Sequence, residues 1–173
     1  MTGELIPQDP QITSLQEMIK EAFPPEKYTG AITQFDPGPW VEELDEEQVL
    51  YQTLKGKSWA EVSSDFIQAH PDSYLRLTHE AYTAFIAAWL NYSLEHMERD
   101  NQVREFLIYT CSPPGNCWDV LSPLNQEQRT TIRALMSEFV DRERSSFIRE
   151  KAIRALARMD ELLRAGKYVP WTG

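Results

Sequence analysis

Two cysteines and three histidines are the residues of this sequence that offer redox, metal-binding or nucleophilic chemistry. Cys111 and Cys117 bracket the segment Ser-Pro-Pro-Gly-Asn, and two thiols in a tight loop can form a reducible disulfide. Their five-residue spacer differs from the C-x-x-C of zinc ribbons and thioredoxin-like sites. In a reducing cytosol two ordinary thiols are the favoured state, so a redox pair is the lesser alternative.

The histidines are too far apart to form a helical metal site. Such a site needs ligands three or four residues apart, whereas His70, His79 and His96 are separated by 9 and 17 residues. A hydrolase would pair a histidine with a serine or cysteine, but the sequence has no nucleophile elbow and no glycine-rich oxyanion or phosphate loop. We therefore expect no catalytic residue, no metal and no cofactor, and we treat an enzyme as the weaker class of function.

A pocket beside the most apolar segment is the alternative to that expectation. A small enzyme or ligand-binding protein would need a cavity with a few convergent polar groups. The residues that could line it are Trp59, His70, Trp89 and His96.

Charge is distributed unevenly along the chain. The net charge is −10, with 18 acidic and 6 basic residues in 1–100 and 9 acidic and 11 basic residues in 101–173. Nucleic-acid binding requires a basic footprint, so this balance argues against it. An acidic face could instead steer a basic partner protein, although charge that serves only solubility is an equally good explanation.

An acidic cluster and a basic stripe are the candidate partner-binding residues. The acidic cluster precedes or opens a predicted helix, where the helix dipole favours negative charge, and that structural role is the favoured one. The basic residues are spaced three and four apart on one face of the last predicted helix. They could bind an acidic partner or a nucleic-acid backbone, but a solvated or internally paired face is favoured. The candidates are Glu42, Glu43, Glu46, Glu47, Lys151, Arg154 and Arg158.

Length and composition indicate one folded domain. At 173 residues and 42% hydrophobic content, the chain can bury a sizeable core. Its longest apolar run, Ala84–Leu90, is seven residues, against the roughly 20 of a membrane helix. The segment MTGELIPQDP lacks the basic start and apolar stretch of a signal peptide. We expect a cytoplasmic protein with no membrane partner.

The segment 79–97 is the predicted centre of the fold. It is apolar on nearly all sides between Ala81 and Leu90, which is typical of a helix inside a bundle. Thr78 is its predicted N-cap, and Ser14, Asp45 and Ser58 are predicted to cap earlier helices. The expected helices span about 15–23, 46–55, 59–69, 79–97, 101–109, 126–143 and 146–165.

The proline-free and glycine-free stretch 125–165 is predicted to break once. Ile132 and Phe139 fall on one side of a helical wheel, whereas Ile148 and Met159 fall on the opposite side. A stripe that changes side requires an interruption, for which the Arg-Ser-Ser segment 144–146 is the natural place.

Short motifs in and after the central segment follow a known pattern. They consist of Gly56, Lys57, Trp59, Glu61, Phe66, His70, Leu77, Thr78, Glu80, Ala81, Tyr82, Asn125, Glu127, Gln128 and Arg129. On these residues the chain resembles a bacterial family of helical proteins with no established activity. The resemblance extends loosely over residues 12–165 and is best over 54–94. It implies a compact helical protein, and it transfers no catalytic residue. The segment from Cys111 to Cys117 is not part of the family's pattern.

The sequence thus predicts an all-α protein, a single domain of six to seven helices around a buried central helix. Residues 1–12 are expected to form a flexible terminus, and residues 166–173 a tail that packs on the bundle through Tyr168 and Trp171. The leading functional hypothesis is a non-enzymatic protein that binds another protein. One version is an immunity or antagonist protein whose acidic first half covers a basic surface.

Overall fold

The computed structural model describes residues 9–34, 45–99, 101–113 and 120–171. Within these ranges the chain is all-α, as predicted, and the only β pairing is one isolated antiparallel bridge between Thr33 and Leu77. The elements are α1 (Pro10–Ala22), α2 (Glu46–Leu54), η1 (Trp59–Glu61), α3 (Ser64–Ala69), η2 (Ser73–Arg76), α4 (His79–Glu95), α5 (Gln102–Cys111), α6 (Gln126–Arg142) and α7 (Ser146–Ala165).

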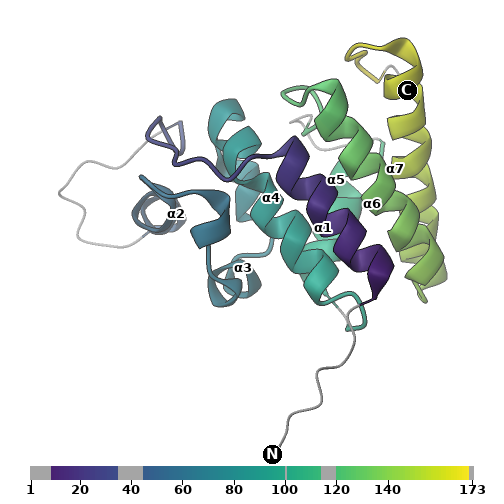
Figure 1. Cartoon of the computed structure of the whole chain (residues 1–173), viewed down its shortest axis with the longest axis horizontal. Helices are drawn as coiled ribbons and strands as arrows, with labels where there is room; N and C mark the ends of the chain where they lie inside the picture. Colours follow the sequence, from purple (N-terminus) through teal and green to yellow (C-terminus); the bar gives the residue numbers. More distant parts are fainter. Residues whose placement is uncertain (1–8, 35–44, 100, 114–119, 172–173) are drawn as a thin grey trace, which may run out of the picture.

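Helix α4 lies at the centre of the fold (Figure 1). It begins where the sequence predicted, because the Thr78 hydroxyl accepts a hydrogen bond from the Ala81 amide at 3.1 Å. The side chains of Phe85, Ile86 and Trp89 are fully buried. Helices α1, α3 and α5 and both 3-10 turns pack against it. The helix ends at Glu95 rather than at residue 97.

The second half of the chain packs beside this centre. Helices α6 and α7 form a tightly packed pair, α5 contacts α7, and α1 contacts both α4 and α6. Figure 1 shows α7 along the outer edge of the molecule, with α2 and α3 on the far side of α4. The buried apolar side chains of the described helices form one contiguous core.

The predicted break in the last long stretch is confirmed. Helix α6 ends at Arg142 and α7 begins at Ser146, with the Ser145 hydroxyl accepting from the Ile148 amide at 3.4 Å. Gly166 then ends α7 in the left-handed conformation, at φ 67°, which glycine adopts without strain.

The predicted start of the first helix is wrong, and the predicted helix over 59–69 is divided in two. The Asp9 carboxylate caps α1 by accepting a hydrogen bond from the Gln11 amide at 2.9 Å. Residues 10–12, which we expected in a flexible terminus, are therefore helical, and Ser14 is not the cap. Pro10 fits the first position because its missing N–H has no intrahelical acceptor there. The predicted capping box of Ser58 and Glu61 is confirmed, but it opens only the short η1, and α3 begins separately with Ser63 as its cap. Helix α5, expected over about 101–109, begins at Gln102 with Asn101 as its cap.

The tail after α7 packs only in part. Tyr168, one of the two predicted contacts, is half-buried against the core, and so is Val169, whereas the side chain of Trp171, the other predicted contact, is 45% exposed. None of the described helices combines the length and the apolarity that crossing a membrane would require.

Candidate functional site

The predicted pocket residues do not meet in any of the pockets that the structure describes. Trp59 and Trp89 are core residues whose indole N–H groups donate to backbone carbonyl oxygens, of Phe23 at 2.7 Å and of His70 at 3.2 Å. The His70 ring is half-buried and stacks near the Phe66 ring, with centroids 4.8 Å apart. Of the four candidates, His96 alone lines one of the described pockets.

Two of the four acidic candidates, Glu46 and Glu47, lie within the residues that the structure describes. Glu46 pairs with Arg76 at 2.6 Å, and Glu47 is half-buried in the first turn of α2. Glu42 and Glu43 lie outside the described residues. Their role in binding a partner therefore remains a prediction.

Two of the three basic candidates pair within the chain, which is the explanation that the sequence favoured. Arg158 is 4% exposed, and its guanidinium donates to Glu161 and to the backbone oxygen of Val169. Arg154 is exposed but pairs with Glu150 at 2.6 Å. The spacing on the helix was right, but α7 turns Arg158 toward the core and the tail.

The structure describes only one of the two cysteines that could form a redox pair. Cys111 is the last residue of α5 and is buried. Cys117 lies outside the described residues, so neither the favoured pair of thiols nor the alternative disulfide is tested.

An exposed aromatic pair lies where α5 and α7 meet. Phe147 in the first turn of α7 is 59% exposed, and Tyr109 near the end of α5 is 37% exposed. Their ring centroids are 6.4 Å apart, and the Lys151 ammonium lies 5.8 Å from the centre of the Phe147 ring. We call Tyr109, Phe147, Lys151 and Arg154 the aromatic surface. Phe147 was detectable in the sequence as an aromatic residue roughly 100° away from the apolar stripe of α7.

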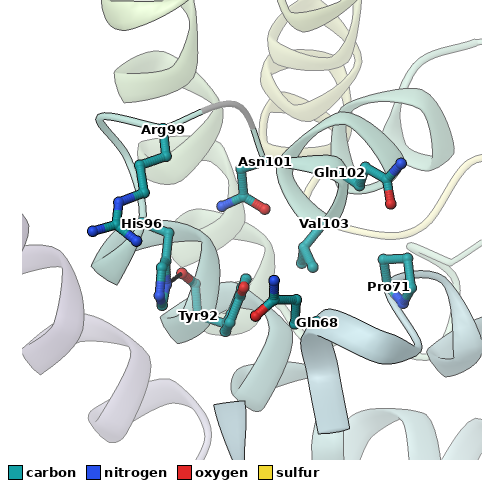
Figure 2. Close-up of a pocket in the computed structure, with 8 residues that line it drawn as sticks. All are labelled: Gln68, Pro71, Tyr92, His96, Arg99, Asn101, Gln102 and Val103. Atoms are coloured by element: carbon teal, nitrogen blue, oxygen red, sulfur yellow. Dashed lines mark hydrogen bonds between the residues drawn. The ribbon is translucent and has the colours of Figure 1, made fainter. Parts of the chain in front are cut away.

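A pocket of about 280 Å³ lies between the end of α3, the end of α4 and the start of α5 (Figure 2). His96, the C-cap of α4, stacks on Tyr92 with ring centroids 4.1 Å apart, and its Nδ1 lies 3.0 Å from the Tyr92 carbonyl oxygen. That contact favours a tautomer with the proton on Nδ1. The pocket is lined by Gln68, Pro71, Tyr92, His96, Arg99, Asn101, Gln102 and Val103.

Asn101 has the smallest exposed fraction among the polar residues that line this pocket. Its Oδ1 caps α5 by accepting from the Arg104 amide at 3.3 Å, and the residue is only 5% exposed. Its Nδ2 is buried and has no hydrogen-bond acceptor among the residues that the structure describes. An unmade hydrogen bond of a buried donor costs free energy, so such a group is expected to have a partner in the functional state.

Several arginines surround the same end of the bundle. Arg142 contacts the carboxylates of Asp9, Glu98 and Glu138. Its hydrogen bond holds the pKa of the Asp9 carboxyl below the usual range, and the pKa of Arg142 is correspondingly raised. Arg99 is exposed at the rim of the pocket and forms no ion pair with any described residue.

The described ranges contain no group of three histidine, cysteine or acidic side chains placed to hold a metal ion. The pocket was not predictable from periodicity, because its walls come from three different helix ends. No family model, no curated protein and no solved structure matches the chain.

Proposed function

We propose that the protein acts by binding another protein through the aromatic surface. The observation that carries this proposal is the exposure of Phe147 at 59% beside Tyr109, whereas most of the other aromatic side chains that the structure describes are buried. Aromatic residues at the centre of an interface often contribute much of the binding free energy, because they bury a large area at a small cost in conformational entropy.

The charge around this pair indicates an acidic partner. The Lys151 ammonium lies 5.8 Å from the centre of the Phe147 ring, and Arg154 lies one turn beyond Lys151, where it pairs with the exposed Glu150. The remainder of the chain is acidic, with a net charge of −10 overall. A partner with acidic side chains around an apolar contact would therefore be steered to this end of α7 and repelled elsewhere.

This proposal changes the surface that the sequence favoured. The acidic version relied on Glu42, Glu43, Glu46 and Glu47, of which Glu46 is engaged by Arg76. A cytoplasmic immunity or antagonist role remains one form of the proposal, with the contact made by α5 and α7.

The test uses two exposed apolar residues of the same helix. Ile153 is 49% exposed and lies roughly 120° around α7 from Phe147, so Ile153→Ala is a matched control for Phe147→Ala. A partner isolated from the native host with the wild-type protein would be purified and titrated against all three proteins. We expect Phe147→Ala to weaken binding about tenfold or more, Ile153→Ala to leave it unchanged, and added salt to weaken it. If the two variants bind alike, the aromatic surface is not the interface.

A further inference from the structure

We propose that the pocket between α3, α4 and α5 binds a small organic molecule through its carboxylate group. The proposal goes beyond protein binding, because the pocket and the aromatic surface lie at opposite ends of α5.

The first step is the unpartnered donor. Figure 2 shows the Asn101 amide projecting from the start of α5 toward the space that Gln68 and Tyr92 enter from the other side. Its Nδ2 lacks an acceptor among the described residues, although Asn101 is almost completely buried. The orientation of the amide is fixed, because Oδ1 is already used as the cap of α5. What the pocket lacks at this point is a hydrogen-bond acceptor.

The second step is the charge of the acceptor. None of the eight lining residues is acidic, although the whole chain has 27 acidic residues. Arg99 contributes a positive charge that no described carboxylate neutralises. Gln102 and Val103 also line the pocket in the first turn of α5, where backbone N–H groups lack intrahelical acceptors and the helix dipole favours an anion.

The third step is the size and shape of the ligand. A volume of about 280 Å³ is at the lower end of the range for small-molecule pockets, so the ligand is small. Pro71, Val103 and the Tyr92 ring provide apolar walls beside the polar groups. Arg99 is the one arginine or lysine among the eight lining residues, so the pocket balances the single charge of a planar carboxylate better than the larger charge of a phosphate. A short organic acid with an apolar body therefore fits best.

The experiment is a titration followed by NMR of the full-length protein. The probes are acetate, benzoate and succinate, the neutral analogue benzamide, and inorganic phosphate. We expect at least one carboxylate to shift the Asn101 side-chain amide and the Gln102 and Val103 backbone amides saturably, with a dissociation constant on the order of millimolar for such small probes. Benzamide should bind at least about tenfold more weakly than benzoate.

Asn101→Asp is the decisive variant, because aspartate caps a helix as well as asparagine does but replaces the donor by a negative charge. We expect it to weaken carboxylate binding by about tenfold or more while the protein stays folded. Asn125→Asp changes the cap of α6 in the same way, away from the pocket, and should leave binding unchanged. Arg99→Gln should weaken binding, and Phe147→Ala should not.

Three outcomes would overturn the proposal. They are the absence of saturable shifts with every carboxylate, equal binding to wild type and Asn101→Asp, and tighter binding of phosphate than of any carboxylate. Each is independent of the aromatic surface, so failure here leaves the proposed protein interface standing.

Discussion

The guanidinium Nε of Arg104 lies 3.3 Å from the Glu143 carboxylate, and both side chains are more than nine-tenths buried. The contact is an ion pair without hydrogen-bond geometry. Arg104 also donates from Nη1 to the Met97 carbonyl oxygen at 2.7 Å. One side chain of α5 therefore holds both the segment after α4 and the break between α6 and α7.

We expect Glu143→Gln to destabilise the protein because it leaves the buried Arg104 charge without its counter-ion. The free energy of unfolding should fall by about 3 kcal/mol, the lower end for a broken buried pair, since glutamine preserves the volume and can still accept. Urea denaturation followed by circular dichroism measures it. Glu150→Gln removes the exposed partner of Arg154 and should cost no more than about 0.5 kcal/mol. Equal effects of the two substitutions would contradict the assignment of a buried pair.

Trp59→Phe tests the indole hydrogen bond to the Phe23 carbonyl oxygen. This bond is 2.7 Å long and buried, and it ties η1 to the end of α1. Removing the donor leaves the carbonyl without this partner, which should lower the free energy of unfolding by about 1–3 kcal/mol. Trp171→Phe is the control, because that side chain is 45% exposed; a substitution there should stay within about 0.5 kcal/mol. A Trp59→Phe protein as stable as wild type would show that the bond contributes little.

Much of this fold was predictable because its signals are local. Thr78 caps α4, and the apolar stripe changes side around Ser145, since capping and periodicity depend on residues within one or two turns. The first helix was misplaced because two caps compete there. Ser14 has a glutamate three residues later, but Asp9 followed by Pro10 starts the helix earlier.

The candidate site was poorly predicted because it depends on contacts between helices. Trp89 lies within α4 and His96 caps the end of the same helix, yet Trp89 is buried in the core and His96 lines the pocket. Arg158 lies at the edge of the apolar stripe of α7, and its burial depends on the tail that covers it. Neither periodicity nor spacing contains that information.

Arg158→Met should release the C-terminal tail. Its guanidinium bonds to the Val169 carbonyl oxygen and to Glu161, so the variant loses a charged hydrogen bond that holds the tail to α7. Loss of about 1.5 kcal/mol corresponds to roughly a tenfold larger population of released tail. Cleavage after Lys167 by endoproteinase Lys-C, followed by mass spectrometry, should accelerate by that factor. Arg154→Met, an exposed position on the same helix, should leave the rate unchanged. An unaltered rate in Arg158→Met would mean that Tyr168 and Val169 hold the tail without it.

The contact between Asp9 and Arg142 predicts a pH dependence of stability in the acid range. The hydrogen bond from Arg142 is the main cause that lowers the pKa of Asp9 in the folded protein, followed by the bond from the Gln11 amide. A carboxyl group whose folded pKa is depressed stabilises the fold above its unfolded pKa of about 3.9, and loses that contribution as pH falls through the folded pKa. Wild type should therefore have a higher free energy of unfolding than Asp9→Asn, by the same amount at pH 7 and at pH 5. This difference should shrink only below about pH 4.

Urea denaturation of the two proteins between pH 7 and pH 2.5 measures this difference. The Arg142→Gln background separates the ion pair from the cap, because the asparagine introduced by Asp9→Asn would still cap α1. In that background the difference between aspartate and asparagine at residue 9 should be smaller at every pH above about 4. A difference that already closes between pH 7 and pH 5 would point to another titrating group, because Asp9 is ionised in both the folded and the unfolded chain over that interval.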